Sequence, residues 1–79
     1  MSLARAHTIT AEIVGNVLSV AVDEGARVLA GDTIVILESM KMEIPVLTEY
    51  DGVVRDVAVQ VGDVVQEGDV LAVVDPVPA

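Results

Sequence analysis

The sequence predicts an all-β domain in which two similar halves pack as a two-sheet sandwich with pseudo-twofold symmetry. The apolar residues are dominated by Val and Ile, and Phe and Trp are absent. β-Branched residues suit the pleated, half-buried surface of a sheet. The second observation is an internal repeat that relates the first half of the chain to the second. No amphipathic helical stretch of useful length interrupts either half.

The repeat is defined by glycines and apolar residues that recur 37 residues apart. The glycine pairs are Gly15 and Gly52, Gly25 and Gly62, and Gly31 and Gly68. The other matching pairs are Val17 and Val54, Val20 and Val57, Val22 and Val59, Val28 and Val65, Ile34 and Leu71, Ile36 and Val73, and Glu12 and Glu49. Each half is too small to bury its own apolar face, so the two halves should pack against each other. We therefore expect residues 11–38 to superpose on residues 48–75 by a near-twofold rotation.

Within each half the pattern reads as short strands joined by turns. Alternating apolar residues at 20–22 and 57–61 indicate half-buried strands. The spacing from residue 17 to residue 20, and from 54 to 57, breaks this period and predicts a bulge or a change of sheet at both places. Turn chemistry, with Gly supplying a positive φ, follows at four positions. These are Asp23-Glu24-Gly25, Ala30-Gly31-Asp32, Gly62-Asp63 and Glu67-Gly68-Asp69.

Length and charge narrow the class of protein. The chain of 79 residues allows one domain, and its net charge of −9 argues against binding nucleic acid or an anionic membrane. High net charge also favours a monomer. No Cys, no secretory signal and no membrane-spanning apolar run are present, so we expect the cytoplasm. Residues 1–8 are expected to be an N-terminal extension, with a tag remnant as one interpretation of part of it, 9–75 the domain, and 76–79 a C-terminal tail.

The segment between the halves, residues 39–47, has no counterpart in this repeat. Predicted strands at 33–38 and 42–47 flank it, so we expect a tight hairpin with Met40 and Lys41 at the tip. The tip lacks the Asn-Gly or Asp-Gly that such turns favour. Local turn propensity therefore did not select these residues, which indicates selection for another purpose.

Lys41 is the only lysine in the chain. A lone lysine at a loop tip is most often solvated and idle, and Met40 and Met42 could tuck into the base of the hairpin. Exposed Met on both sides of the lysine would instead provide an adaptable, polarizable contact for a partner. We expect the tip to be exposed.

The sequence Glu38-Ser39-Met40-Lys41-Met42 resembles the attachment motif of the biotinyl domain (biotin carboxyl carrier) family. The resemblance covers residues 9–75, includes the paired glycine turns, and is closest to short, free-standing biotinylated proteins. It implies a flattened barrel of two four-stranded antiparallel sheets, with biotin covalently attached to Lys41 and with Met40, Met42, Ser39 and Glu38 as the recognition motif. Ser39 departs mildly from the Ala of many relatives. The constant spacing leaves no room for the thumb loop of some bacterial acetyl-CoA carboxylase carriers.

The resemblance also implies a carrier function rather than catalysis. A biotin ligase would attach biotin to Lys41, a biotin carboxylase would charge it, and a carboxyltransferase would discharge the carboxybiotin. The alternative from the same fold is a lipoyl-type carrier domain, whose lysine usually follows Asp and precedes Ala. A third class, the adaptor modules of membrane-fusion proteins, needs a long helical insertion for which residues 38–43 leave no room.

Three other residues are expected to be structural. His7 lies in an end that we expect to fray, so a metal or catalytic role is disfavoured, and no other residues suggest a metal site. Pro45 should lie on an edge strand or at a bulge, because it cannot donate to a sheet ladder. Tyr50, the only aromatic residue of the Phe, Trp and Tyr set, should pack at the start of a strand rather than stack on a ligand.

Overall fold

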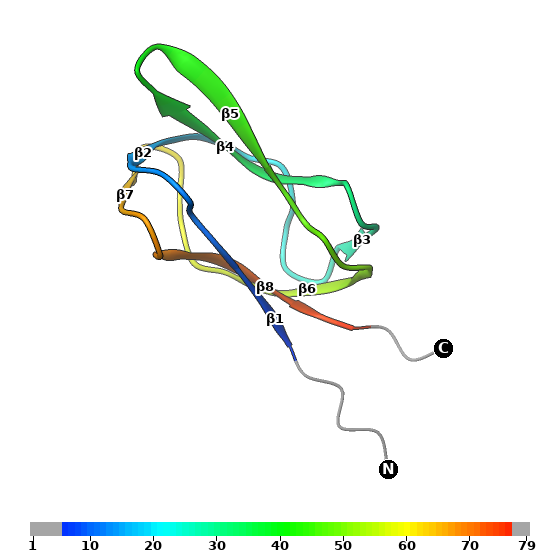
Figure 1. Cartoon of the computed structure of the whole chain (residues 1–79). Coiled ribbons are helices and arrows are strands. Elements are labelled where there is room, and N and C mark those ends of the chain that lie inside the picture. The colour runs from blue at the N-terminus through cyan, green and yellow to red at the C-terminus, as the bar shows by residue number, and fades with distance from the viewer. Residues whose placement is uncertain (1–5, 77–79) are drawn as a thin grey trace.

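Two four-stranded antiparallel sheets face each other in the computed structural model, which describes residues 6–76 (Figure 1). The strands are β1 (His7–Thr10), β2 (Gly15–Val20), β3 (Arg27–Val28), β4 (Thr33–Ser39), β5 (Met42–Leu47), β6 (Gly52–Val57), β7 (Val64–Val65) and β8 (Val70–Asp75). One sheet, here called the β1 sheet, has the order β1-β8-β6-β3, and the other, the β5 sheet, has the order β5-β4-β2-β7. The predicted all-β, two-sheet architecture is confirmed, and the described residues contain no helix.

The pseudo-twofold relation is visible in the strand bounds. Strands β2, β3 and β4 begin 37 residues before β6, β7 and β8, respectively. Applying this offset to the order β5-β4-β2-β7 gives β1-β8-β6-β3, so the twofold exchanges the two sheets. It also pairs β1 with β5, because residues 7–10 match residues 44–47. The expectation that residues 39–47 have no counterpart in the repeat is therefore wrong for residues 44–47. The match to β1 is weak in the sequence, because Ile9 and Val46 are the only similar pair among these four positions.

The predicted irregularities are β-bulges. The register between β2 and β4 shifts between Val17 and Ser19, and the register between β6 and β8 shifts between Val54 and Asp56. These two sites are again 37 residues apart. The bulges let both strands bend while their apolar residues continue to face the interior.

The turns repeat in the same way. Gly25, Gly31, Gly62 and Gly68 all have φ between 88° and 96°, a region that only Gly enters without strain. The Gly25 nitrogen donates to the Val54 oxygen at 2.7 Å, and the Gly62 nitrogen donates to the Val17 oxygen at 2.8 Å. The predicted turn glycines therefore define the corners of both halves.

The core lies between the sheets and is built from matching residues of the two halves. Its buried apolar side chains are Ile9, Ala11, Val17, Val28, Ile34, Val35, Leu37, Val54, Val59, Val65, Leu71, Ala72 and Val74. Three of these, Ile34, Val35 and Leu37, lie on β4 and are fully buried. Strand β4 is thus fixed in the core along most of its length before it enters the hairpin.

The N-terminal strand differs from expectation, whereas Tyr50 packs two residues before the start of β6, close to where it was expected. His7, which was expected to lie in a fraying end, begins β1 and is paired with Val74 of β8. Its ring stacks on Tyr50, with the ring centroids 3.5 Å apart. Tyr50 lies in the loop before β6, and this stack connects that loop to the β1 sheet. Most of the expected N-terminal extension and C-terminal tail lies outside the described residues. Among residues 6–76, no helix of sufficient length and hydrophobicity to cross a membrane is found.

Candidate functional site

The hairpin of β4 and β5 projects beyond the body of the sandwich, away from the ends of the described chain (Figure 1). The two strands pair from Thr33 and Leu47 at the base to Ser39 and Met42 at the top. Met40 and Lys41 therefore form a two-residue turn, as predicted. Strand β5 is the edge of its sheet, and Pro45 lies in it, which confirms the edge placement expected for that residue.

The turn holds both of its central residues in a left-handed conformation. Met40 has φ 53° and Lys41 has φ 65°, and they are the only positive-φ residues other than Gly among residues 6–76. A type I′ hairpin turn requires positive φ at both positions, which is why such turns favour Asn-Gly. A left-handed L-residue costs roughly 1–2 kcal/mol. Met and Lys at these positions are therefore retained against local preference, which indicates that their side chains serve a function.

The tip side chains are open to solvent. Met40 is 91% exposed and Met42 is 63% exposed, so the alternative in which they tuck into the hairpin base is wrong. Lys41 is also exposed, and Ser39 is half-buried. Among the described residues, the ion pair within 4 Å is formed by Arg55 and Asp75, at 3.4 Å, and does not involve Lys41. The Lys41 amine is thus available to another molecule.

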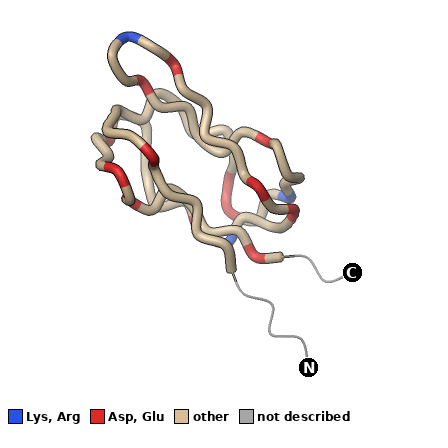
Figure 2. Tube along the Cα trace, in the orientation of Figure 1, with Lys and Arg blue, Asp and Glu red and all other residues tan. Residues whose placement is uncertain are grey.

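Two carboxylates lie below the tip on one face of the hairpin. Glu38 and Glu43 are directly opposite each other on β4 and β5, and both are exposed. Figure 2 shows one red segment on each arm of the hairpin below the blue tip. Like charges directly opposite on neighbouring strands destabilise a sheet slightly. The site therefore presents a single ammonium group above an acidic pair.

The base of the hairpin is fixed by close backbone packing. Asn16 of β2 pairs with Glu38 of β4, next to Gly15. A Cβ atom added at Gly15 would lie 2.8 Å from the Glu38 main-chain oxygen, so only Gly permits this approach. The sequence singled out Gly15 as part of the repeat, but not as a support of the hairpin. Gly52, 37 residues later, approaches the main chain of Asp75 in the same way. The repetition of this glycine in both halves was the sequence signal that could have indicated a close backbone contact at Gly15.

The titratable side chains of residues 6–76 include no metal-binding cluster. No group of three or more His, Cys, Asp or Glu side chains in this range is arranged to hold a metal ion. The five residues of the predicted motif, 38–42, lie together at the hairpin end, with Lys41 at its tip. A primary amine on a short, stiff projection can be acylated by another protein and can then present the attached group to further active sites.

Comparison with known proteins gives a family match over nearly the whole described chain. The model of the Biotin_lipoyl family, described as "Biotin-requiring enzyme", matches residues 6–74. A biotinylated protein TB7.3 homolog of Mycobacterium leprae is 55% identical over 69 residues, which is 87% of this chain and 97% of that protein. The alpha3 subunit of a biotin-dependent acyl-coenzyme A carboxylase of the same organism is 47% identical over 64 residues, which is 81% of this chain but 11% of the subunit.

Solved structures show the same fold in two kinds of protein. The urea carboxylase of Kluyveromyces lactis matches with a TM-score of 0.85 and 31% identity, over 94% of this chain and 6% of that chain. The lipoyl domain of the 2-oxoglutarate dehydrogenase complex of Azotobacter vinelandii matches with a TM-score of 0.68 and 27% identity, over 84% of this chain and 94% of that domain. The similarity to the carboxylase segment is greater in both measures.

Proposed function

The chain belongs to the Biotin_lipoyl family of biotin-requiring enzymes, and from this membership we propose that it is a biotin carrier whose Lys41 holds the biotin. The observation that carries the proposal is the tip of the hairpin. The only lysine of the chain lies there between two exposed methionines, in a turn whose backbone disfavours both central residues. A full-length relative that is itself a biotinylated protein supports the choice of cofactor.

The residues at the tip fit the group. Lys41 would hold biotin through an amide bond between its Nζ atom and the carboxyl group of the biotin side chain. The exposed tip offers no steric obstacle, and Met40 and Met42 supply apolar surface beside the bond. Bound biotin supplies a ring nitrogen that accepts and releases a carboxyl group. The chain itself supplies the attachment point and its placement.

The chain contributes a long side-chain arm for the biotin and a rigid hairpin that holds the start of this arm. The Lys41 side chain and the biotin side chain together span about ten bonds, or roughly 14 Å. The buried residues of β4 and the contact of Gly15 with Glu38 keep the start of this arm in place. Tethering keeps the group at a high effective concentration near any active site that binds the domain. This arrangement suits transfer between two active sites that lie apart.

The partners we propose are a biotin ligase, a biotin carboxylase and a carboxyltransferase. Two relatives support the last two, because segments similar to this chain occur within an acyl-coenzyme A carboxylase subunit and a urea carboxylase. This chain corresponds to only 11% and 6% of those proteins, so the catalytic steps would take place on other domains or polypeptides.

A lipoyl-type carrier is the second candidate, and the fold match to a lipoyl domain favours it. The tip residues argue against it. Lysines that carry lipoyl groups usually follow Asp and precede Ala, whereas Met40 and Met42 occupy those positions here. We therefore retain biotin as the proposed cofactor.

Intact-mass spectrometry decides between the two cofactors. The chain should gain one biotin when it is produced together with a biotin ligase, and it should gain none when a lipoate ligase replaces that enzyme. The matched control is Lys41→Arg, which keeps the positive charge and should abolish the modification. Because a side chain at the tip has few packing contacts, the melting temperature should hardly change. Biotin that is still attached to the Lys41→Arg variant would show that the site is wrong.

A further inference from the structure

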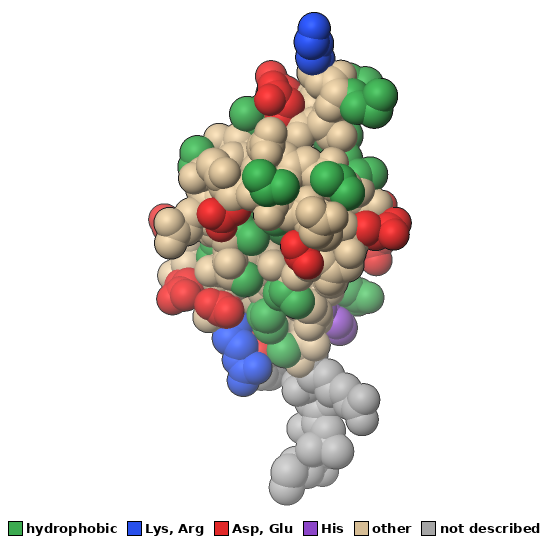
Figure 3. Space-filling model, turned by 90° about the vertical axis from the view of Figure 1, so that its left-hand side faces the viewer, with side chains coloured by type: hydrophobic (Ala, Val, Ile, Leu, Met, Phe, Trp, Pro, Cys, Tyr) green, Lys and Arg blue, Asp and Glu red, His purple; other side chains and the backbone are tan. Residues whose placement is uncertain are grey.

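Three exposed valines lie beside the hairpin, at one end of the β5 sheet. We call them the valine patch: Val14, Val61 and Val64. They are 54%, 65% and 65% exposed, respectively. Figure 3 views the molecule from the side of β2 and β7; green side chains gather below the blue side chain at the tip, with red side chains around them. Exposed Val gains little in a stable monomer, so several of them together need an explanation.

Strand pairing connects the patch to the hairpin. Asn16 of β2 pairs with Glu38 on one side and with Val64 of β7 on the other. The outer face of the sheet is therefore continuous from the hairpin to Val64, over two strand spacings of about 5 Å each. Val14 is exposed and directly precedes Gly15, the first residue of β2, which pairs with Val65 of β7. Val61 adjoins Gly62, whose nitrogen donates to the Val17 oxygen of β2 at 2.8 Å.

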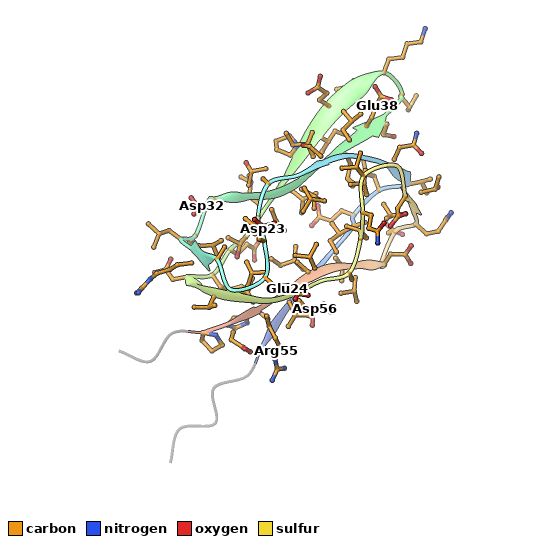
Figure 4. The ribbon with its side chains drawn as sticks, turned by 180° about the vertical axis from the view of Figure 1, so that it is seen from behind. Asp23, Glu24, Asp32, Glu38, Arg55 and Asp56 are labelled. Carbon is orange, nitrogen blue, oxygen red and sulfur yellow. The ribbon has the colours of Figure 1, made fainter. Side chains whose placement is uncertain are left out.

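The internal repeat provides a control that most proteins lack. The residues 37 positions away from Val14, Val61 and Val64 are Asp51, Glu24 and Arg27, all exposed. They occupy the same places around the same type of turn, as the matching φ angles of Gly25 and Gly62 show. Figure 4 labels Glu24 far from Glu38 of the hairpin. The backbone therefore accepts charged residues at all three positions, and valines occupy these positions only at the end of the domain that carries Lys41.

The other end does expose the apolar side chain of Leu29, which is 58% exposed. Exposed apolar area alone is therefore not special to the lysine end. What distinguishes the valine patch is its place next to the hairpin, where Glu38, Glu43 and Asp63 are also exposed. A partner that covers this surface needs an apolar centre and basic side chains at its margin.

We propose that the valine patch is the docking surface for the biotin ligase that modifies Lys41, through an apolar area of that enzyme bordered by Lys or Arg. The inference rests on the proposed function and extends it to the part of the domain that the ligase binds. Met40, Met42 and the acidic pair Glu38 and Glu43 contact the active-site entrance, and the patch contacts the neighbouring surface.

The reach of the lysine favours the ligase over the carboxylase. Unmodified Lys41 extends only about 6 Å from the backbone, so an enzyme that reacts with its amine must approach the body of the domain closely. A carboxylase instead receives a ring at the end of an arm of roughly 14 Å and can act from farther away. The requirement for close contact therefore applies first to the ligase.

The test replaces each residue of the valine patch with the residue found at the equivalent position of the repeat. The triple variant Val14→Asp, Val61→Glu and Val64→Arg places side chains that this fold already holds in equivalent positions. Its melting temperature should stay within about 2 °C of the unsubstituted chain. The KM for biotinylation by a biotin ligase should rise about tenfold or more, with a smaller change in kcat. The matched control is Leu29→Gln, which removes an exposed apolar side chain at the other end of the domain. Gln is the residue at the equivalent position 66, and this variant should leave KM unchanged.

A second measurement separates docking from a change in the lysine itself. An activated ester of biotin needs no docking surface, so peptide mass spectrometry should show the same rate of its reaction at Lys41 in both proteins. If the ligase fails to modify the unsubstituted chain, the proposed function is wrong. If it modifies both chains with the same KM, only the docking inference is wrong. A dimer of the unsubstituted chain that the triple variant dissociates, with KM unchanged, would assign the patch to a second copy instead.

Discussion

Gly15 and Glu38 approach each other so closely that a Cβ atom on Gly15 would lie 2.8 Å from the Glu38 main-chain oxygen. This contact joins the start of β2 to the end of β4, where the hairpin leaves the sandwich. Gly15 has no positive φ, so its role is to leave space and not to turn the chain. The contact lies three residues from Lys41, and it therefore connects the position of the tip to the body of the domain.

Gly15→Ala should destabilise the domain by about 1–3 kcal/mol, because the added methyl group meets backbone that cannot move without disturbing the β2–β4 pairing. In a domain of this size that corresponds to a loss of several degrees in the melting temperature. Thermal unfolding measures the effect. Asn16→Ala, next to Gly15 but with an exposed side chain, is the control and should change the melting temperature little. Equal stability of Gly15→Ala and the unsubstituted chain would contradict the close contact.

Met40→Asn should make the domain more stable and a poorer substrate. Asn tolerates a left-handed backbone better than Met, so the unfolding free energy should rise by about 0.5–1 kcal/mol. Biotinylation should slow, because the 91% exposed Met40 side chain is lost as a contact. Chemical denaturation and initial rates of biotinylation measure the two effects. Met42→Asn is the control: Met42 lies in β5 without a positive φ, so no stabilisation is expected there. Stabilisation by both variants would remove the argument from turn strain.

Most of this fold could be predicted from the sequence because the two halves of the chain repeat the same pattern of turns and strands. Paired glycines located the turns, and the breaks in alternation at residues 17–20 and 54–57 located both bulges. The correspondence between β1 and β5 escaped notice because these edge strands are less buried, so the repeat constrains their residues weakly. The stack of His7 on Tyr50 could not be predicted, because it joins residues far apart in the chain that share no pattern.

The candidate site was predicted in its residues but not in its conformation. The sequence placed Met40 and Lys41 at a tip without turn-forming residues. Only the backbone angles show that both lie in the left-handed region. The valine patch could not be recognised from the abundance of Val, because Val is common throughout the chain. The informative positions are those at which the two halves differ in residue type. Positions 14, 61 and 64 are apolar, whereas their counterparts are charged, which a search for similarity passes over.

The choice of cofactor should depend on the methionines. The double variant Met40→Asp and Met42→Ala should reduce biotinylation by a biotin ligase strongly and should allow some modification by a lipoate ligase. Intact mass after production with each ligase distinguishes the two products. The control is Leu47→Ala, which shortens an exposed apolar side chain at the far end of β5. If a biotin ligase modifies the double variant as fast as the unsubstituted chain, the enzyme recognises the fold alone and the methionines have another role.

Carboxylation of the attached biotin and its discharge should both require other enzymes, since the described residues supply one tethering amine, a stiff base and an acidic surface. The biotinylated domain alone should neither hydrolyse ATP nor fix bicarbonate. With a matching biotin carboxylase, ATP and bicarbonate, it should acquire a labile carboxyl group, and a carboxyltransferase with its acceptor should remove that group again. Labelled bicarbonate follows both steps.

Electrostatics predicts how these rates respond to salt. A chain with a net charge of −9 should meet a basic partner faster at low ionic strength, and the charging rate should fall as salt screens the attraction. The matched control is free biotin as the substrate of the same carboxylase, because it lacks the acidic surface and should show a much weaker dependence on salt. The decisive comparison titrates the biotinylated domain against purified carboxylases. If none charges it faster than free biotin, the domain does not act as a carrier, and storage of biotin or competition for the ligase becomes the better account of its attached group.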